Sequence, residues 1–284
     1  MIYSSLIGNP VDHSVSPILF NYLAECANLE YAHIKINVPT SKNLNDTLDS
    51  LKMLGFCGAN VTLPYKIDII KYLDQISPAA KKIGAVNTLV LKHGKVIGYN
   101  TDAYGAQMAI ESKLKKIGPD DKILILGAGG AARAIIYAMY QKTKNILILN
   151  RDLTEAKFVA KDISGDKIIY KKLTNSNIKG GLSAANVIIN ATPVGMSPRD
   201  NDEIIGKNLL KEVNVSNKYF FDAVFNPYRT VFLKTAANHG ARVCSGTYMM
   251  IYQAIAAFNL WTGRRLAELD IEKINKLLIK TLKH

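Results

Sequence analysis

A glycine-rich turn between an apolar run and a helix-forming stretch is the feature that most constrains this chain. The apolar run covers residues 123–126 and the helix-forming stretch covers residues 133–139. Between them stand Gly127, Ala128, Gly129, Gly130, Ala131 and Ala132. In this order of strand, turn and helix, the first glycine makes the tight turn, the second lets the backbone approach a phosphate, and a small third residue lets the helix pack on the strand. The turn therefore predicts a Rossmann domain that binds the pyrophosphate of a dinucleotide.

A second strand-like run favours dinucleotide binding over a purely structural glycine turn. Residues 145–149 return after one helix and end at Asn150, Arg151 and Asp152. The end of the second strand is where a Rossmann domain recognises the ribose of its cofactor. We therefore expect residues 127–132 and 150–152 to hold the dinucleotide.

The composition fits a folded protein of about two domains. With 284 residues and 48% hydrophobic content, the chain can bury two cores. Cys26, Cys57 and Cys244 form no C-x-x-C pair and have no Cys/His ligand spacing, so neither a disulfide framework nor a metal site is expected. Free thiols suit a reducing, cytoplasmic location, and Met1 opens a strand-like run with no signal peptide.

The formal net charge of +13 raises the question of a nucleic-acid or membrane partner. The lysines are scattered singly with no basic run among aromatic residues, so we expect no nucleic-acid partner; the charge would favour an anionic cofactor or a carboxylate substrate. No charged residue occurs between Arg242 and Arg264, which is long enough to span a membrane. Polar residues such as Gln253 and Asn259 interrupt it, so we expect a buried helix and no membrane partner.

Strand-like and helix-like runs alternate along the chain, which predicts mostly parallel sheets covered by helices. In the first hundred residues we expect strands at 3–7, 33–38, 57–62 and 88–91, and helices at 17–27, 44–54, 66–73 and 78–83. His93-Gly94 predicts a hairpin that pairs 88–92 with 95–99. After a linker helix at about 103–116, strands are expected at 122–126, 145–150, 187–190 and 219–223.

These runs predict an α/β protein of two domains. Residues 1–102 would form a substrate-binding and catalytic domain, residues 103–245 a Rossmann domain, and residues 246–284 helices that return to pack on the first domain. The last of these helices, 271–280, is amphipathic and has Asp270 as its expected N-cap. Because ligands bind at the carboxyl ends of parallel strands, we expect the chemistry in the cleft between the two domains. A monomer and a homodimer both fit the sequence.

Ser14 and Ser16 form the first candidate binding cluster. They are two residues apart, and the residue before Pro17 is biased to extended geometry, so both hydroxyls can face the same side. Such a pair suits a carboxylate. The alternative is that Ser16 only caps a helix that begins at Pro17.

Lys66 and Asp102 are the candidate catalytic pair. Lys66 follows the expected strand end at Thr62, and a lysine in the first turn of a helix opposes the macrodipole, which suits a general acid/base. Each residue also has a simpler interpretation, since an isolated lysine is usually solvated and Asp102 could be only an N-cap. Asn87 could donate its amide to a substrate hydroxyl or simply close a turn. If the ammonium and the carboxylate meet, they form the proton-transfer group that oxidation of an alcohol by a nicotinamide needs.

Ordered motifs along nearly the whole chain resemble the shikimate dehydrogenase family. They are Gly8-Asn9-Pro10, Ser14 to Pro17, Asn60-Val61-Thr62 with Pro64 and Lys66, Ala85 to Leu89, Asn100-Thr101-Asp102, the glycine turn, Asn190 to Met196, and Gln253 with Phe258 and Trp261. The resemblance implies reversible reduction of 3-dehydroshikimate to shikimate, in the biosynthesis of aromatic amino acids, with Lys66 and Asp102 as the catalytic pair. It also implies further ligand contacts: Ser14 and Ser16 to the carboxylate, Thr62, Asn87 and Gln253 to ring hydroxyls, and Thr192, Ala223 and Gly246 to the dinucleotide.

The chain departs from the family pattern at several positions. Phe225 stands where a tyrosine commonly helps to hold the carboxylate, and Tyr248 stands in place of a glycine. These departures keep two alternatives open: a quinate/shikimate dehydrogenase of broader specificity, and a non-catalytic Rossmann ligand sensor. NADP is the family default and Arg151 matches it, whereas the carboxylates of Asp152 and Glu155 repel a phosphate and argue for NAD. Both cofactors stay open at this point.

Overall fold

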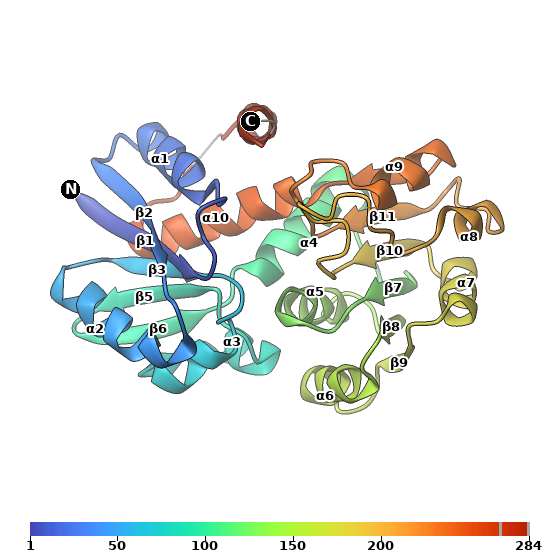
Figure 1. The fold of residues 1–284 in the computed structure, drawn as a ribbon, viewed down its shortest axis with the longest axis horizontal. Coiled ribbons are helices and arrows are strands. Elements are labelled where there is room, and N and C mark those ends of the chain that lie inside the picture. The colour runs from blue at the N-terminus through green and yellow to red at the C-terminus, as the bar shows by residue number, and fades with distance from the viewer. Residues whose placement is uncertain (267–268, 283–284) are drawn as a thin grey trace. The chain divides into compact units, whose positions relative to one another are not determined.

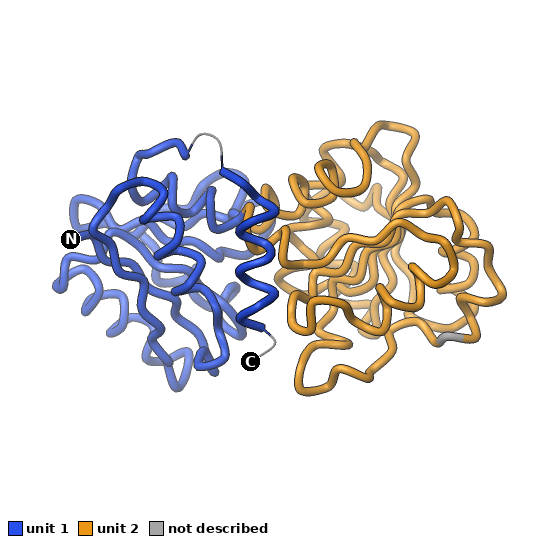
Figure 2. Tube along the Cα trace, turned by 90° about the horizontal axis from the view of Figure 1, so that it is seen from above, with its two compact units in different colours: residues 1–101, 253–284 blue, residues 102–252 orange. Residues whose placement is uncertain are grey.

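The computed structural model describes residues 1–266 and 269–282, and the chain divides into two compact units. Unit 1 comprises residues 1–101 and 253–284, and unit 2 comprises residues 102–252 (Figure 2). The division falls inside the helix α10 (Gly246–Thr262). Each unit contains a six-stranded sheet of its own. The α/β class and the mostly parallel sheets predicted from the sequence are confirmed, while the predicted domain boundaries stay predictions.

The sheet of unit 1 has the strand order β2-β1-β3-β5-β6-β4. Its strands are β1 (Ile2–Gly8), β2 (Tyr31–Asn37), β3 (Gly58–Val61), β4 (Gln75–Ile76), β5 (Thr88–Lys92) and β6 (Lys95–Tyr99). β1 is parallel to β2 and β3, whereas β5 is antiparallel to β3 and β6. In the turn between β5 and β6, His93 and Gly94 adopt φ values of 51° and 74°. These values are typical of a two-residue hairpin, as predicted.

Helices cover the sheet of unit 1 (Figure 1). They are α1 (Ser16–Cys26), α2 (Leu44–Met53), α3 (Pro78–Ile83) and the last part of α10, with 3₁₀ helices at Ser41–Asn43 and Asp68–Tyr72, while α11 (Ile271–Thr281) packs on α1. Leu44, Leu48 and Leu51 of α2 pack against the sheet in one buried cluster. Trp261 of α10 packs its ring 5.0 Å from that of Phe20 in α1, centroid to centroid. The C-terminal helices therefore return to the first unit, as predicted.

Close packing of α10 on the sheet of unit 1 requires a glycine. The indole nitrogen of Trp261 donates to the carbonyl oxygen of Leu89 at 2.8 Å. A Cβ atom on Gly58 would lie 2.0 Å from that nitrogen, so no other residue fits there. Ile251, Ala257 and Phe258 of α10 are fully buried. Nowhere in residues 1–266 and 269–282 is a helix both long and apolar enough to cross a membrane.

Unit 2 has the strand order of a Rossmann domain, β12-β11-β10-β7-β8-β9, and all its strand pairs are parallel. The strands are β7 (Ile123–Leu126), β8 (Ile146–Asn150), β9 (Ile169–Lys172), β10 (Val187–Asn190), β11 (Tyr219–Asp222) and β12 (Arg242–Cys244). The helices are α4 (Asp102–Lys113), α5 (Gly130–Tyr140), α6 (Leu153–Ser164), α7 (Asn175–Ala184), α8 (Lys207–Lys211) and α9 (Val231–Asn238). β7 and β10 are buried along their whole length, because helices α5 and α6 cover one face and α7 and α8 the other (Figure 1). The order of strands reverses between β7 and β10, where a Rossmann domain binds its ligand.

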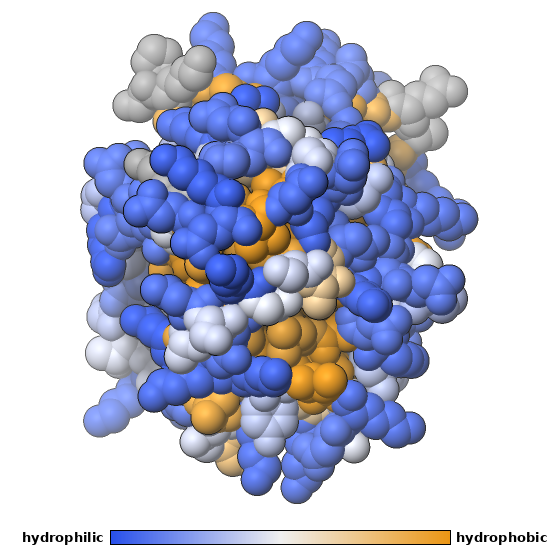
Figure 3. Space-filling model, turned by 90° about the vertical axis from the view of Figure 1, so that its right-hand side faces the viewer, coloured by the Kyte–Doolittle hydropathy of each residue, from blue (hydrophilic) through white to orange (hydrophobic). Residues whose placement is uncertain are grey.

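Hydrophilic and hydrophobic side chains are unevenly distributed over the face of the molecule in Figure 3. Figure 3 shows a face on which hydrophilic residues surround hydrophobic ones gathered near the centre. Phe158 in α6 and Ile169 in β9 are among the exposed large hydrophobic side chains of unit 2. Singly exposed apolar residues of this kind are ordinary on globular proteins.

One helix predicted from the sequence is wrong. Residues 66–73 form a turn and then a five-residue 3₁₀ helix, Asp68–Tyr72, rather than an α-helix. The run contains β-branched isoleucines, which lower helix propensity, and tertiary contacts fix both flanks. Tyr65 donates its hydroxyl to the carbonyl of Val38 at 2.6 Å, and Asp74 accepts from the backbone N–H of Val96 at 2.7 Å. Lys66 therefore lies in a turn, and the helix-dipole argument for its chemistry does not apply.

Candidate functional site

Unit 1 contains a buried polar cluster where β3 ends and β5 begins. Asn87 is its centre: its side-chain oxygen accepts from the N–H of Thr101 at 2.7 Å. Its amide nitrogen donates to the hydroxyl oxygen of Thr101 at 3.1 Å and to the side-chain oxygen of Gln253 at 3.4 Å. Two residues predicted to contact substrate, Asn87 and Gln253, are thus brought together from positions far apart in the sequence.

Asn60 belongs to this cluster, although sequence reasoning did not select it. Its amide nitrogen donates to the carbonyl of Asn87 at 3.2 Å and to the hydroxyl of Thr88 at 3.3 Å. Its side-chain oxygen is buried with no hydrogen-bond partner, and the residue is 5% exposed. A buried acceptor without a donor is costly, so this oxygen needs a donor that the described side chains do not supply. The signal in the sequence is its place two residues before Thr62, on the same side of the strand.

Ser14 and Ser16 lie together at the start of α1. The hydroxyl of Ser14 donates to that of Ser16 at 3.0 Å and accepts from the backbone N–H of Ser16 at 3.2 Å. Helix α1 begins at Ser16 itself, and its N-cap, Val15, has no side-chain cap bond, so the alternative that Ser16 only caps the helix is wrong. Lys35 of β2, which the sequence did not suggest, donates its ammonium to the carbonyl oxygens of Asp12 at 2.5 Å and Ser14 at 3.4 Å. A positive charge is thereby fixed next to this pair of hydroxyls.

Thr62 and Lys66 follow β3 in unit 1. Thr62 packs tightly on β1, since a Cβ atom on Gly8 would lie 2.3 Å from its methyl group. Lys66 is half-buried in the turn that follows. Asp102 is the first residue of α4 in unit 2 and is buried. The pairing of Lys66 with Asp102 stays a prediction.

The glycine turn of unit 2 has the geometry that a dinucleotide pyrophosphate needs. Gly127 has a φ of 107°, which favours glycine, and a Cβ atom there would lie 2.8 Å from the methyl carbon of Thr192. Gly129 is the N-cap of α5 and makes no side-chain cap bond. A Cβ on Gly129 would meet nothing within 4 Å, so a phosphate can approach this backbone and the first N–H groups of the helix. Ala132 is fully buried where the helix packs on the sheet.

Two further segments predicted to contact the dinucleotide meet at Gly246. A Cβ atom on Gly246 would lie 2.4 Å from the carbonyl oxygen of Ala223 and 2.7 Å from that of Val224. Only glycine therefore fits at the start of α10. Tyr248, one of the departures from the family pattern, is buried with the ammonium of Lys113 4.6 Å from its ring centroid.

The ends of β8 and β9 form a shallow pocket that the residues Arg151, Asp152, Leu153 and Lys172 line. Asp152 is the N-cap of α6, and one of its oxygens accepts from the N–H of Thr154 at 2.7 Å and of Glu155 at 3.4 Å. The Glu155 carboxylate accepts from the amide of Asn150 at 2.9 Å. Both carboxylates are therefore engaged within the protein, while Arg151 and Lys172 bring positive charge.

Lys172 was missed because strand β9 was missed. β9 is parallel to β8, and Asn150 is paired with Lys172, so the two strand ends lie side by side where a Rossmann domain recognises the ribose of its cofactor. The signal was the run of lysines at 171–172 after an apolar pair. Among the described residues, no cluster of His, Cys, Asp and Glu could hold a metal ion.

Comparison with protein families gives three matches along the chain. Residues 6–89 match the model described as shikimate dehydrogenase substrate binding domain, and residues 110–223 match that described as shikimate / quinate 5-dehydrogenase. Residues 246–271 match the shikimate 5'-dehydrogenase C-terminal domain.

Similar proteins extend over almost the whole chain. A shikimate dehydrogenase (NADP(+)) of Methanocaldococcus jannaschii is 41% identical over 277 residues, which cover 96% of this chain and 95% of the relative. A crystal structure of a shikimate dehydrogenase in complex with NADP+ has a TM-score of 0.89 at 38% identity and covers 99% of this chain and 96% of that one. A shikimate 5-dehydrogenase of Listeria monocytogenes in complex with shikimate and NAD has a TM-score of 0.86 at 30% identity, covering 98% and 96% of the two chains.

Proposed function

Because the chain belongs to the shikimate dehydrogenase family, we propose that it catalyses the reversible reduction of 3-dehydroshikimate to shikimate with a nicotinamide dinucleotide. The observation that carries this proposal is the presence, in one chain, of a buried hydroxyl-binding cluster around Asn87 and an open glycine turn at Gly129. The first suits a polyhydroxylated ring and the second suits a pyrophosphate. This activity would belong to the biosynthesis of aromatic amino acids.

In this proposal unit 1 holds the substrate. The hydroxyls of Ser14 and Ser16 donate to the substrate carboxylate, and the charge of Lys35 supports binding of an anion there. Thr62, Asn87 and Gln253 contact the ring hydroxyls. To these we add Asn60, whose buried side-chain oxygen would accept a hydrogen bond from one of them.

Lys66 and Asp102 would carry out the proton transfer. When bound, the nicotinamide supplies the hydride for reduction and accepts it in the reverse reaction. Lys66 donates a proton to the carbonyl oxygen of 3-dehydroshikimate, and takes it back from the hydroxyl of shikimate when the alcohol is oxidised. Asp102 orients the amine and stabilises its charged form. The glycine turn 127–132, with Thr192, Ala223 and Gly246, would hold the dinucleotide against unit 2.

We further propose that NADP is the preferred cofactor. Arg151 and Lys172 line one pocket and could both contact a ribose phosphate, whereas the carboxylates of Asp152 and Glu155 are engaged in hydrogen bonds of the protein. The relative from M. jannaschii is named as NADP(+)-dependent, while the L. monocytogenes structure contains NAD. A cytoplasmic location and a monomeric or homodimeric state remain predictions from the sequence.

The test is an absorbance assay of nicotinamide reduction with shikimate or quinate as substrate and NADP+ or NAD+ as cofactor. We expect shikimate with NADP+ to give the highest kcat/KM, at least about tenfold above NAD+, since each charge-assisted contact to the phosphate is worth roughly 1.5 to 3 kcal/mol. A preference for quinate would instead indicate the broader sister branch, which Phe225 keeps open. Binding without turnover would indicate a ligand sensor.

Lys66→Ala tests the proton-transfer assignment within the same assay. Loss of a positioned acid/base typically lowers turnover by about 10² to 10⁴, so kcat should fall by that factor. Lys71→Ala, in the following 3₁₀ helix, is a matched control that removes an equal charge. An unchanged kcat in the Lys66 variant would refute the assignment.

A further inference from the structure

The end of β10 and both ends of the loop between β11 and α9 meet at one fully buried carboxylate of unit 2. Asp222, the last residue of β11, is 0% exposed. One of its oxygens accepts from the amide of Asn190 at 2.9 Å and from the N–H of Val224 at 3.0 Å, and the other accepts from the hydroxyl of Thr230 at 2.6 Å. Asn190 is the last residue of β10, and Val224 and Thr230 lie in the segment between β11 and α9. All these donors are uncharged.

Asn190 links this carboxylate to the glycine turn. It ends β10 and is paired with Asp222 in the parallel register of the sheet. Its side-chain oxygen accepts from the N–H of Thr192 at 3.1 Å and from the hydroxyl of Thr192 at 2.7 Å. The methyl group of Thr192 in turn lies against Gly127, the first residue of the turn. One chain of contacts therefore runs from the buried acid to the pyrophosphate-binding backbone.

The other partners of Asp222 fix the remaining loop. Val224 follows Ala223, and the carbonyl oxygens of both residues face Gly246. Thr230 is the N-cap of α9 and accepts from the N–H of Leu233 at 3.3 Å. The carboxylate thereby connects both ends of the loop between β11 and α9. These are the loops on the side of the switch point that carries the nicotinamide half in a Rossmann domain.

A neutral side chain would not define this arrangement as well. In its ionised form Asp222 only accepts, which matches the amide nitrogen that Asn190 presents to it, and the Thr192 N–H and the Val194 carbonyl favour the same orientation of Asn190. An amide at position 222 could turn its own nitrogen toward that of Asn190, which would weaken this contact and loosen the position of Asn190. Burying an ionisable carboxyl group with only uncharged partners is costly, so its presence calls for a role beyond stability.

We propose that Asp222 is a positioning residue for the nicotinamide half of the dinucleotide. It acts through Asn190 on Thr192 and the glycine turn, and through Val224 on the Ala223 segment. The inference rests on the proposed function, because it requires a dinucleotide on unit 2. The adenosine half, by contrast, would bind at Arg151 and Lys172 on the ends of β8 and β9, which these contacts do not include.

The experiment compares binding of the whole cofactor with binding of its adenosine half. Dissociation constants of NADP+ and of adenosine 2′,5′-bisphosphate are measured by calorimetry for the full-length wild type and for Asp222→Asn. We expect the affinity for NADP+ to fall roughly tenfold, as for loss of a charge-assisted contact, and the affinity for the fragment to change less than about twofold. The turnover number should fall as well, because the nicotinamide is misplaced rather than only weakly held.

Asp121→Asn is the matched control, since it changes a buried aspartate at the opposite ends of the strands of the same sheet. It should leave the ratio of the two affinities unchanged. In an Asn190→Ala background, Asp222→Asn should weaken NADP+ binding by a smaller factor than in the wild type, because the route through Asn190 is already lost and only the route through Val224 remains. If Asp222→Asn does not fold, Asn190→Ala carries the same test and should lower NADP+ affinity alone.

Equal losses for NADP+ and the fragment, or no loss for either, would overturn the inference and leave Asp222 a purely structural residue. A wild-type protein that binds neither probe would instead refute the proposed function, and this inference with it. The two failures are therefore distinguishable in one set of titrations.

Discussion

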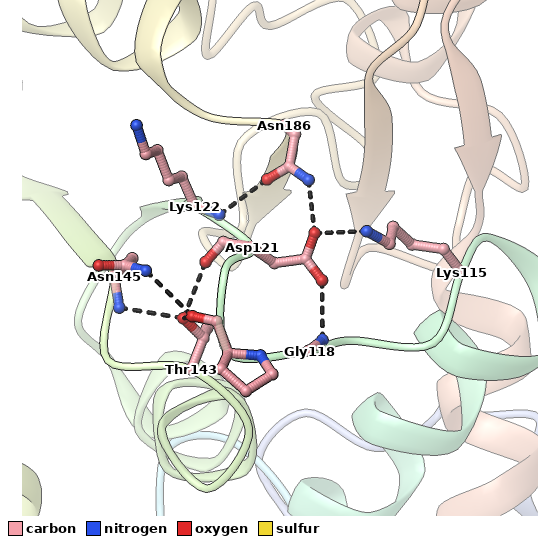
Figure 4. Close-up of polar contacts among 8 residues, drawn as sticks. Lys115, Gly118, Asp121, Lys122, Thr143, Asn145 and Asn186 are labelled. Carbon is pink, nitrogen blue, oxygen red and sulfur yellow. Dashed lines mark hydrogen bonds and ion pairs between the residues drawn. The ribbon is translucent and has the colours of Figure 1, made fainter.

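Two buried aspartates occupy opposite ends of the sheet in unit 2 and are held in different ways. Asp121 stands just before β7, at the amino ends of the strands, and Asp222 ends β11, at their carboxyl ends. Asp121 accepts from the N–H of Gly118 at 2.8 Å, from the amide of Asn186 at 2.5 Å and from the ammonium of Lys115 (Figure 4). Asp222 has no cation among its contacts within the described part of the chain. The two environments have opposite consequences for charge.

Burial raises the pKa of a carboxyl in both places, but only at Asp121 is this overcome. There the Gly118 N–H and the ion pair and hydrogen bonds to Lys115 and Asn186 outweigh burial and lower the pKa below its usual value. At Asp222, burial outweighs the hydrogen bonds from Thr230, Val224 and Asn190 and raises the pKa to about 7. An ion pair thus fixes its partners over a wide pH range, whereas a carboxylate held by neutral donors changes protonation near neutrality.

The amino-end cluster extends into a network that joins three segments. The hydroxyl of Thr143 donates to the carbonyl of Asp121 at 2.8 Å, and Asn186 accepts from the N–H of Lys122 at 2.8 Å (Figure 4). The linker before β7 is thereby tied to the starts of β8 and β10. Ligands bind at the other ends of parallel strands, so this cluster supports stability, and we assign the functional constraint to the carboxyl end.

The largest expected effect on stability comes from His33 in unit 1. It must be measured separately from the effects of Asp121 and Asp222. His33 is buried, with its ring 4.3 Å from that of Phe20 and one nitrogen 2.6 Å from the hydroxyl of Ser4, and burial lowers its pKa to about 3. Below pH about 6.5 the unfolded chain binds a proton that the native state does not. The free energy of unfolding should therefore fall as the pH falls from about 6.5 to 3, by up to about 5 kcal/mol. Denaturant unfolding of wild type and His33→Gln across this range should show a larger loss in the wild type, and the difference between the two proteins is the contribution of His33.

For Asp222 we expect the free energy of unfolding to change with pH in the opposite direction. Between pH about 4 and 7 the native state binds a proton that the unfolded state has released, so stability is highest in acid and is lost as the pH rises through about 7. The difference is up to about 4 kcal/mol for a pKa moved from 3.8 to about 7. Measured in the His33→Gln background, the added Asp222→Asn change should remove this slope. A slope that persists in the double variant would show that another group titrates.

The sequence predicted the fold where the physical signal was local. The glycine turn, the apolar runs of β7 and β10 and the His93-Gly94 hairpin all placed their elements correctly. β9 and β4 were missed because edge strands bury little: β9 is mostly exposed and β4 has two residues. The false helix at 66–73 arose because contacts made by Tyr65 and Asp74 with distant strands decide its conformation.

For the candidate site, motifs at strand ends indicated residues but not their partners. In the structure Ser14 is hydrogen-bonded to Ser16, and Asn87 is hydrogen-bonded to Gln253. The role of Asn190 toward Asp222 could not be read from the sequence, because it depends on the register of two parallel strands 32 residues apart. Residues whose importance comes from packing partners, rather than from a motif, are the ones that sequence reasoning misses.

The smallest expected effect on stability comes from Asp121, at the amino ends of the strands of unit 2, and it tests the comparison with Asp222 directly. Asp121→Asn at neutral pH places an amide among three donors and should lower the free energy of unfolding by about 2 kcal/mol, as for a partly buried charged hydrogen bond. Because the native pKa of Asp121 is lowered, this advantage of the wild type should persist above pH about 4 and disappear as the pH falls further. This pH dependence of stability is opposite in sign to the one expected for Asp222. Urea unfolding monitored by circular dichroism measures both.

Lys115→Met is the matched variant, since it removes the cation and leaves the Gly118 and Asn186 donors in place. It should cost less than Asp121→Asn, because two donors still satisfy the carboxylate and the Lys115 side chain is 28% exposed. The native pKa of Asp121 should then rise, since burial is no longer opposed by an ion pair. The pH dependence of stability that Asp121 causes should accordingly become more like that of Asp222. If instead Lys115→Met destabilised the protein as strongly as Asp121→Asn, the ion pair itself would be the source of stability, and the contrast between the two ends would rest on charge pairing alone.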